Sequence, residues 1–213
     1  MKSLLIFVNI LFLAFLMITS FAYTDVVYVG DDPDTKGDWV GKYGNNGVII
    51  FAMEDLQDMK DITVFDDGGN NRWDWENPTE DERGLLYPDG SGQRTGSCVY
   101  NNPDGIFTIE TSLDSYQVAA YVVDWDSDVR IQDMTGFQGA EAPADPHVIV
   151  ENPVFNGGVY HIWQVTGGEP FKLQVVHQGG ANWVMTGIFV DEIDTAAVEP
   201  GDKLATTWSK IKK

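Results

Sequence analysis

Val118-Ala119-Ala120-Tyr121-Val122-Val123 is the stretch that decides the fold class, because it is apolar at every position. A strand with one face in water would carry a polar side chain at every second position. An uninterrupted apolar run that is rich in β-branched and aromatic residues instead indicates a central strand covered on both faces. The sequence therefore predicts a sheet with a layer of structure on each side.

Shorter runs of the same kind recur along the chain, separated by clusters of Gly, Asn, Asp and Pro. Short strands with turn signals between them favour an antiparallel sandwich or barrel, and no long helical patterns alternate with them, which excludes an α/β fold. We expect an all-β antiparallel β-sandwich, with helical patterns only at residues 54–61 and 203–213. The predicted strands are residues 25–29, 35–43, 47–53, 106–111, 117–123, 129–133, 148–151, 158–165, 171–177 and 183–190.

Two connections stand out among the predicted strands. Asn46-Gly47 accepts the positive φ values of a tight turn, so we expect a hairpin there. Residues 66–94 are rich in Gly, Asn, Asp, Glu and Pro, and they are predicted to form a loop that is long for a compact domain. Loops of that size are usually functional or flexible.

Composition limits the class of protein. The 213 residues suit one sizeable domain, and a net charge of −20 argues against nucleic acid as a partner, because phosphates would be repelled. The single cysteine, Cys98, excludes an internal disulfide framework and lies in an alternating stretch, so we expect a small buried apolar side chain there.

The first 22 residues have the pattern of a secretory signal peptide. Lys2 supplies a positive start, residues 4–18 are apolar apart from Asn9, and Ser20 and Ala22 suit a cleavage site. An uncleaved anchor is the alternative, although the apolar run is short for a membrane span. We expect a β-sandwich domain over residues 23–195 that is secreted to the exterior or cell surface, or lies in the periplasm if retained.

Residues 196–213 are predicted to be a linker and a short basic tail. Leu204, Trp208 and Ile211 fall on one face of a helix, beside several lysines. Such a tail suits contact with an anionic cell surface, or it lies on the acidic domain.

Five stretches of the chain form a recognisable set of motifs: Thr35 to Gly44 with Gly47, Val122 to Asp126 with Arg130, Gly157 to Trp163, Gly179 to Trp183, and Thr186 to Phe189. These motifs resemble galactose-binding-like and carbohydrate-binding β-sandwich modules of secreted bacterial proteins, which are often attached to glycoside hydrolases. The resemblance spans about residues 31–191 and implies a sandwich of the jelly-roll or galactose-binding-like type that binds sugar without a catalytic signature. Unlike those modules, this one is expected to stand almost alone, with no hydrolase domain beside it.

The predicted loop 66–94 carries the candidate sugar-binding residues. Trp73 and Trp75 offer flat indole faces to the C–H face of a sugar, and Asp74 accepts hydroxyl hydrogen bonds. Arg72 and Tyr87 complete the candidate site. In the alternative, the aromatic side chains fold back as a lid, and Arg72 and Arg83 pair with nearby acids.

Asp124, Asp126 and Asp128 place carboxylates at alternate positions, which share one face of an extended chain. Converging carboxylates suit Ca²⁺, so these residues are a candidate calcium site, although the EF-hand spacing is absent. In the alternative, Asp126 or Asp128 pairs with Arg130 and Asp124 caps a turn. The residues Asp31, Asp32 and Asp34 form a second acidic cluster.

The remaining patterns do not support catalysis. His147, His161 and His177 lack zinc-ligand spacing, and no nucleophile or phosphate-binding motif is present. We expect Trp39, Trp125, Trp163 and Trp183 to pack in the core. The sequence thus favours a monomeric, non-catalytic module that recognises a polysaccharide or surface glycan. The alternatives are an adhesion or scaffold protein that binds another protein and a glycoside-acting enzyme.

Overall fold

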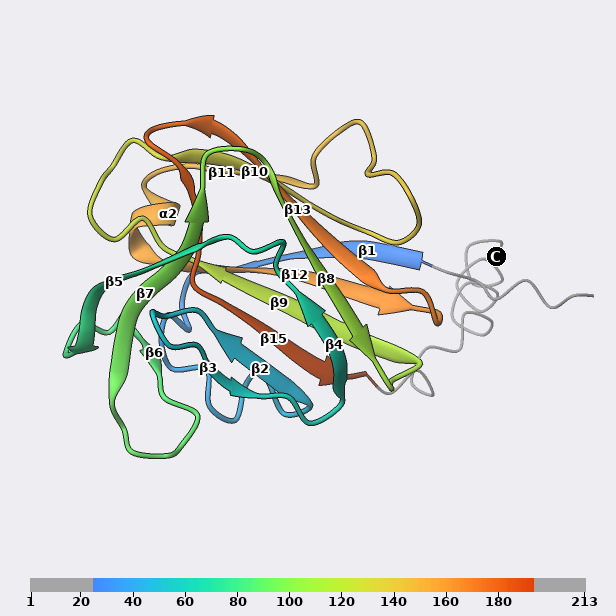
Figure 1. The fold of residues 1–213 in the computed structure, drawn as a ribbon, viewed down its shortest axis with the longest axis horizontal. Coiled ribbons are helices and arrows are strands. Elements are labelled where there is room, and N and C mark those ends of the chain that lie inside the picture. Colours follow the sequence, from blue (N-terminus) through green and yellow to red (C-terminus); the bar gives the residue numbers. More distant parts are fainter. Residues whose placement is uncertain (1–24, 194–213) are drawn as a thin grey trace, which may run out of the picture.

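The computed structural model describes residues 25–193, and these fold almost entirely into antiparallel strands (Figure 1). The predicted signal peptide, the end of the predicted domain and the basic tail lie outside the described residues. The elements are β1 (Asp25–Asp32), β2 (Gly47–Ile50), β3 (Leu56–Asp58), β4 (Ile62–Asp66), β5 (Asn71–Thr79), β6 (Leu85–Leu86), β7 (Arg94–Asn101), β8 (Gly105–Thr111), β9 (Ser115–Val122), β10 (Ile131–Phe137), β11 (Val148–Val150), α2 (Val154–Gly157), β12 (Val159–Thr166), β13 (Phe171–Gly179), β14 (Trp183–Met185) and β15 (Gly187–Glu192).

The strands form three sheets in two layers. One layer is a six-stranded sheet in the order β1-β12-β9-β15-β2-β3. Facing it are a sheet in the order β11-β10-β13-β8-β4 and a smaller one in the order β14-β7-β5, to which β6 adds beside β7 (Figure 1). Side chains from all three sheets share one apolar core, which is the packing that holds the layers of a sandwich together.

The central strand β9 is covered on both faces, as its sequence predicts. Val118, Ala120 and Val122 pack into the core between the layers. Ala119 and Tyr121, one position out of phase, join a second apolar cluster on the outer face of the same sheet. All these side chains are inaccessible to water, so both faces of β9 contribute to stability.

The second cluster is closed by residues 35–46, which we call the cover segment. Trp39 and Tyr43 of this segment lie against Phe189 of β15, with ring centroids 5.2 and 6.3 Å away. The expected strand over residues 35–43 is wrong, because this stretch folds into turns joined by an isolated bridge between Val40 and Tyr43. Glycines that adopt positive φ interrupt the extended pattern, at Gly41 and, just beyond the stretch, at Gly44.

Two further local predictions are wrong. The Asn46-Gly47 hairpin is absent from the described strands, because β2 begins at Gly47 and pairs with β15 and β3 instead of with the preceding residues. The expected helix over residues 54–61 is instead β3 and its flanking turns. There, Asp55 accepts the Ala52 amide at 3.1 Å, and Lys60 has a positive φ that ends regular structure.

Residues 66–94, predicted to be a loop, contain β5 and β6. Both strands pair with β7, so part of the segment is the wall of a sheet. Its polar composition reflects exposure on one side. The buried positions predicted for Cys98, Trp39, Trp163 and Trp183 are confirmed, and Trp125 is half-buried.

Across residues 25–193 there is no helix with the length and apolar character needed to traverse a bilayer.

Candidate functional site

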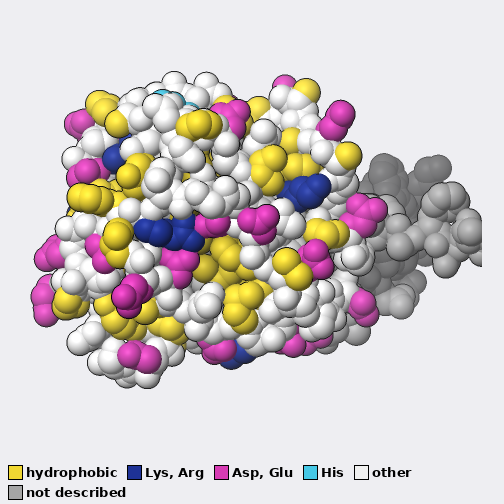
Figure 2. All heavy atoms as spheres, viewed as in Figure 1, with side chains coloured by type: hydrophobic (Ala, Val, Ile, Leu, Met, Phe, Trp, Pro, Cys, Tyr) yellow, Lys and Arg dark blue, Asp and Glu magenta, His cyan; other side chains and the backbone are white. Residues whose placement is uncertain are grey.

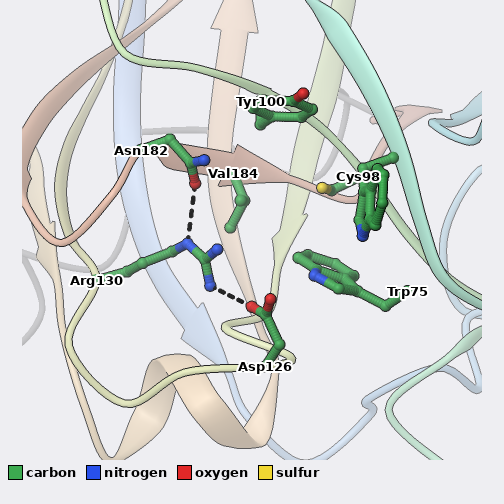
Figure 3. Close-up of a pocket in the computed structure, with 8 residues that line it drawn as sticks. Trp75, Cys98, Tyr100, Asp126, Arg130, Asn182 and Val184 are labelled. Atoms are coloured by element: carbon green, nitrogen blue, oxygen red, sulfur yellow. Dashed lines mark hydrogen bonds and ion pairs between the residues drawn. The ribbon is translucent and has the colours of Figure 1, made fainter.

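A pocket of about 210 Å³ opens beside the small sheet of β14, β7 and β5 (Figure 3). Its aromatic wall comes from β5, its base from β7 and β14, and its polar wall from the connection between β9 and β10 together with the residue before β14. The residues that line it are Trp73, Trp75, Cys98, Tyr100, Asp126, Arg130, Asn182 and Val184.

The aromatic wall contains the two tryptophans that the sequence singled out. Trp73 lies opposite Cys98 in the register of β5 and β7, and 53% of Trp73 is exposed. Trp75 is half-buried and stacks on Trp125, with ring centroids 6.1 Å apart and planes 8° from parallel. One indole therefore faces water across the pocket while the other is held by packing.

Arg72 and Asp74 lie on β5 on either side of Trp73 but make their contacts elsewhere. Arg72 donates from Nε and Nη2 to Asp55 at 2.8 and 2.7 Å, and it pairs with Asp67 at 2.5 Å. Asp74 accepts the Met53 amide at 2.9 Å. Because alternate residues of a strand face opposite sides, these two side chains fasten β5 to the β2–β3 connection and do not line the pocket.

Tyr87 is also remote from this pocket. Its hydroxyl donates to Asn77, and the side chain lines a different hollow of about 190 Å³ next to Trp39 and Tyr43. Of the five candidate sugar-binding residues, the structure therefore brings together only Trp73 and Trp75 in this pocket.

The polar wall is built on an ion pair. Arg130, whose side chain is 8% exposed, bonds through Nη1 to the fully buried carboxylate of Asp124 and, at 2.6 Å, to Asp126, which is half exposed. Ser127 donates to both oxygens of Asp124 at 2.8 Å, and the Arg130 amide donates to Asp124 at 3.2 Å. Burial would lower the pKa of Arg130, but hydrogen bonds to Asp126 and Asp124 raise it, so the guanidinium stays charged.

This geometry corresponds to the ion-pair alternative for the acidic motif. The guanidinium sits where a calcium ion between Asp124 and Asp126 would have to sit, and Asp128 is exposed. Within residues 25–193, no three His, Cys, Asp or Glu side chains are placed to hold a metal ion. The three aspartates therefore do not fit a calcium site, and we derive no role through calcium.

The second acidic cluster also has an internal use. Asp32 accepts hydrogen bonds from the Thr35 hydroxyl at 2.5 Å and the Tyr43 hydroxyl at 2.7 Å, and it pairs with Lys42 at 2.7 Å. Burial alone would raise the pKa of Asp32, but these bonds hold it far below the usual range. Asp32 thus anchors the cover segment to the end of β1.

The two tryptophans Trp75 and Trp125 lie within a column of cations and rings. Arg83 lies over Trp125 with its guanidinium carbon 4.6 Å from the ring centroid. Arg130 lies over Trp75 at 6.0 Å. Such contacts favour a fixed ring orientation, so Arg83 and Trp125 position Trp75 from outside the pocket.

Cys98 and the histidines are placed structurally. Burial raises the pKa of the Cys98 thiol, so it stays protonated at neutral pH and has little nucleophilic character. His147 accepts the Trp163 indole N–H at 2.9 Å, and His161 bonds Tyr28 at 3.0 Å through Nδ1. His177 bonds the Gly179 carbonyl at 3.1 Å. Burial lowers the pKa of His147 and lowers that of His161 to about 4.

Sequence reasoning missed the contributions of Tyr100 and Asn182 to the pocket. Asn182 accepts the Arg130 Nε–H at 3.0 Å, which joins two chain segments far apart in sequence. Asn182 lies within the quoted motif Gly179 to Trp183, but no pattern assigned either residue to a pocket, because the pairing of β14 with β7 brings Tyr100 opposite Val184.

No protein-family model, no curated protein and no solved structure matches this chain. The resemblance to carbohydrate-binding modules therefore rests on the quoted motifs. Several of their residues serve the fold: Trp39 and Trp163 are buried, and a Cβ on Gly44 would lie 3.1 Å from Phe189.

Proposed function

We propose that this protein is an exported, non-catalytic carbohydrate-binding module that recognises a polysaccharide or surface glycan through the pocket at Trp73. The observation that carries the proposal is an exposed indole facing a guanidinium, a carboxylate and an amide across a small pocket. Sugars need both elements, since their C–H faces stack on aromatic rings and their hydroxyls take directed hydrogen bonds.

The finer parts of the proposal come from the sequence. The signal-peptide pattern of residues 1–22 supports export, and the basic tail supports association with an anionic cell surface. The motif resemblance supports a jelly-roll or galactose-binding-like sandwich, a type compatible with antiparallel sheets around one core. We propose a monomer as the binding unit.

We do not propose catalysis at this pocket. A glycoside hydrolase needs two carboxyl groups placed as acid and as base or nucleophile. Asp124 and Asp126 both accept from Arg130, and Asp124 is fully buried beneath it. These carboxylates are therefore committed to the wall of the pocket.

Affinity electrophoresis of the whole chain in gels that contain different polysaccharides tests the proposal. We expect at least one polysaccharide to retard the protein, and Trp73→Ala to weaken that binding about tenfold or more, since an exposed stacking platform is lost. Because Trp73 is half exposed, the variant should keep its fold. Val27→Ala shortens another exposed apolar side chain, on β1, and serves as the control.

Two results would contradict the proposal. One is the absence of retardation across a broad panel of plant, bacterial and animal polysaccharides. The other is retardation that Trp73→Ala leaves unchanged, because the sugar would then bind somewhere else.

A protein-binding adhesion or scaffold function is the second candidate, and β1 favours it. This strand lies at the edge of the six-stranded sheet, and it exposes Val27 and Val29, each 47% accessible. Apolar edge strands are templates for strand addition by another chain. Pull-down from the envelope of the producing cell would favour this function if a protein partner survives excess glycan and is lost in Val27→Lys.

A further inference from the structure

The polar wall of the pocket has unused hydrogen-bonding capacity on its inner side. Arg130 uses Nε for Asn182 and Nη1 for the two aspartates, and its Nη2 has no hydrogen-bond partner among residues 25–193. Asp126 accepts through Oδ1 only, and the Asn182 amide nitrogen is likewise unpaired within that range. Figure 3 shows the guanidinium, the carboxylate and the amide along one side of the pocket, with Trp75 across from them.

This wall offers donors and an acceptor side by side. Arg130 Nη2 and the Asn182 amide can only donate, whereas the free oxygen of Asp126 can only accept. A ligand group that satisfies both must accept and donate at adjacent atoms. Neighbouring hydroxyls do this, because each hydroxyl carries one donor hydrogen and two acceptor lone pairs.

The charge of the wall disfavours an acidic ligand. Arg130 contributes one positive charge, while Asp124 and Asp126 contribute two negative charges in direct contact with it. The site is therefore negative by one unit, inside a chain whose net charge is −20. A carboxylate or sulfate on a sugar would be repelled by the site and by the field of the whole molecule.

A cationic ligand stacked on Trp75 is disfavoured by the same arginine. Aromatic walls attract ammonium groups when a ring face is free to receive them. Here the guanidinium carbon of Arg130 already lies 6.0 Å from the centroid of Trp75, so a second cation against this ring would meet a like charge.

The size and shape of the pocket limit how much of a glycan enters. Its volume of about 210 Å³ is below the roughly 300–1,000 Å³ typical of pockets for drug-sized ligands, so it holds a single ring. Trp75 and Tyr100 lie on one side and Asp126, Arg130 and Asn182 on the other (Figure 3), and Trp73 lines the same pocket. Walls on opposite sides suit the end of a chain better than its middle.

We propose that the pocket binds the terminal residue of a neutral glycan as one uncharged pyranose ring, an inference that rests on the proposed function. Trp73 covers a C–H face of the ring. Two adjacent hydroxyls bridge the Arg130 Nη2 donors and the free oxygen of Asp126. The Asn182 amide donates to a further hydroxyl or to the ring oxygen.

Calorimetric titration of the whole chain with single methyl pyranosides tests this charge class. The panel contains neutral hexosides, the corresponding uronides and the corresponding 2-amino sugars. We expect at least one neutral hexoside to bind, its uronide to bind at least tenfold more weakly, and its amino sugar to gain nothing. Binding of the uronide that equals or exceeds that of its neutral hexoside, or tighter binding of the amino sugar, would overturn the inference.

Asp126→Asn provides the matched variant, because it removes one negative charge and keeps a side chain of the same shape. We expect the ratio of the affinity for the neutral hexoside to the affinity for its uronide to fall several-fold in this variant. An unchanged ratio would overturn the role assigned to Asp126. Thermal melts of the variant show whether its fold is intact.

Failure of this inference is distinguishable from failure of the proposed function. If a polysaccharide binds through Trp73 while no methyl pyranoside binds or competes, the chain-end inference is overturned and the proposed function stands. If neither polysaccharides nor pyranosides bind, both are overturned.

Discussion

The cover segment and the pocket wall on β5 are both rich in aromatic residues, but the structure uses them in opposite ways. Trp39 and Tyr43 in the cover segment are each 6% exposed, whereas Trp73 on β5 is 53% exposed. The Trp39 indole N–H donates to the Leu86 carbonyl at 2.8 Å, and the Tyr43 hydroxyl donates to Asp32. The indole N–H groups of Trp73 and Trp75 have no such partner among residues 25–193.

The difference shows that aromatic content does not indicate binding by itself. An aromatic side chain that is buried needs its polar atom satisfied within the protein, and the cover segment supplies those partners. Around Trp73 the polar groups belong to a separate wall and face the same open volume. We take an unpaired indole facing unpaired polar groups as the feature that separates a binding surface from a core.

The largest expected effect contrasts the two tryptophans directly. Trp39→Ala should lower the free energy of unfolding by about 3–5 kcal/mol, because it opens a cavity and removes a satisfied hydrogen bond. Trp73→Ala should change it by about 0.5 kcal/mol or less. Urea unfolding of both variants measures the difference, and similar losses would break the comparison.

The buried part of the polar wall should contribute to the free energy of unfolding, as the core does, and its exposed part should contribute little. Arg130→Met leaves the fully buried carboxylate of Asp124 without its counter-ion. We expect this variant to lose about 3 kcal/mol of the free energy of unfolding, measured by urea unfolding. Asp126→Asn, at a half-exposed carboxylate, should cost less than about 1 kcal/mol. The double variant Asp124→Asn/Arg130→Met should recover part of the loss. Equal effects of the two single changes would show that burial does not govern this wall.

Lowering the pH should destabilise the protein through His161, a buried side chain with a nitrogen that is unpaired within residues 25–193. His161 is 2% exposed, and its Nε2 has no partner among the described residues. Burial lowers its pKa to about 4 from an ordinary value of 6.5, while Asp31 opposes the shift. Between these two pH values His161 is protonated in the unfolded chain and neutral in the folded protein. The free energy of unfolding therefore falls as the pH drops.

We expect His161 to lower the free energy of unfolding by about 3 kcal/mol between pH 6.5 and pH 4, at about 1.4 kcal/mol per pH unit. Denaturant melts across that range measure it. His161→Gln should remove most of the slope, and an unaltered slope in that variant would mean that other groups cause it.

Trp125 packs against the apolar cluster that contains the cover segment's Trp39, and it also stacks on Trp75 of the pocket wall. The absence of a side chain at Gly96 leaves space for the Trp125 ring. A Cβ at Gly96 would lie 2.6 Å from the Trp125 ring, so Gly96→Ala must displace that ring and loosen its stack on Trp75. We expect a loss of about 1–2 kcal/mol and weaker sugar binding. Gly168→Ala, where a new Cβ meets nothing within 4 Å, is the matched control. Full sugar affinity in Gly96→Ala would show that Trp75 does not need its support.

The smallest expected effect concerns calcium. Because the Arg130 guanidinium already lies between Asp124 and Asp126 and pairs with both, a chelator should leave the melting temperature unchanged. A lower melting temperature in chelator, restored by Ca²⁺, would show that a ligand binds the folded state through acids that we have assigned to the ion pair.

Part of the fold follows from the sequence because burial leaves a local pattern. The apolar run of β9 predicts a strand covered on both faces, and the structure confirms it with a separate cluster on each side. The alternation around Cys98 likewise predicts a buried thiol. The polar strand β5 carries no such pattern, which is why residues 66–94 look like a loop.

The candidate site was predicted in part. The pair Trp73 and Trp75 line the pocket, but Arg72 and Asp74 point to the other side of β5, since a strand alternates its faces. For the acidic motif, the alternative in which Asp126 pairs with Arg130 is confirmed, whereas the pairing of Asp124 with the same arginine was not predicted. The sequence placed Asn182 in a motif but did not assign it to the pocket, where it accepts a hydrogen bond from Arg130.

The sequence by itself determined the class of structure, because hydrophobic burial and β-propensity act over a few neighbouring residues and are visible as composition and spacing. Tertiary structure alone decided which aromatic residues stay open to water. That outcome depends on whether a carbonyl or carboxylate from a distant part of the chain reaches the polar atom of each ring. The Leu86 carbonyl accepts the Trp39 indole N–H, whereas none of the described residues accepts that of Trp73.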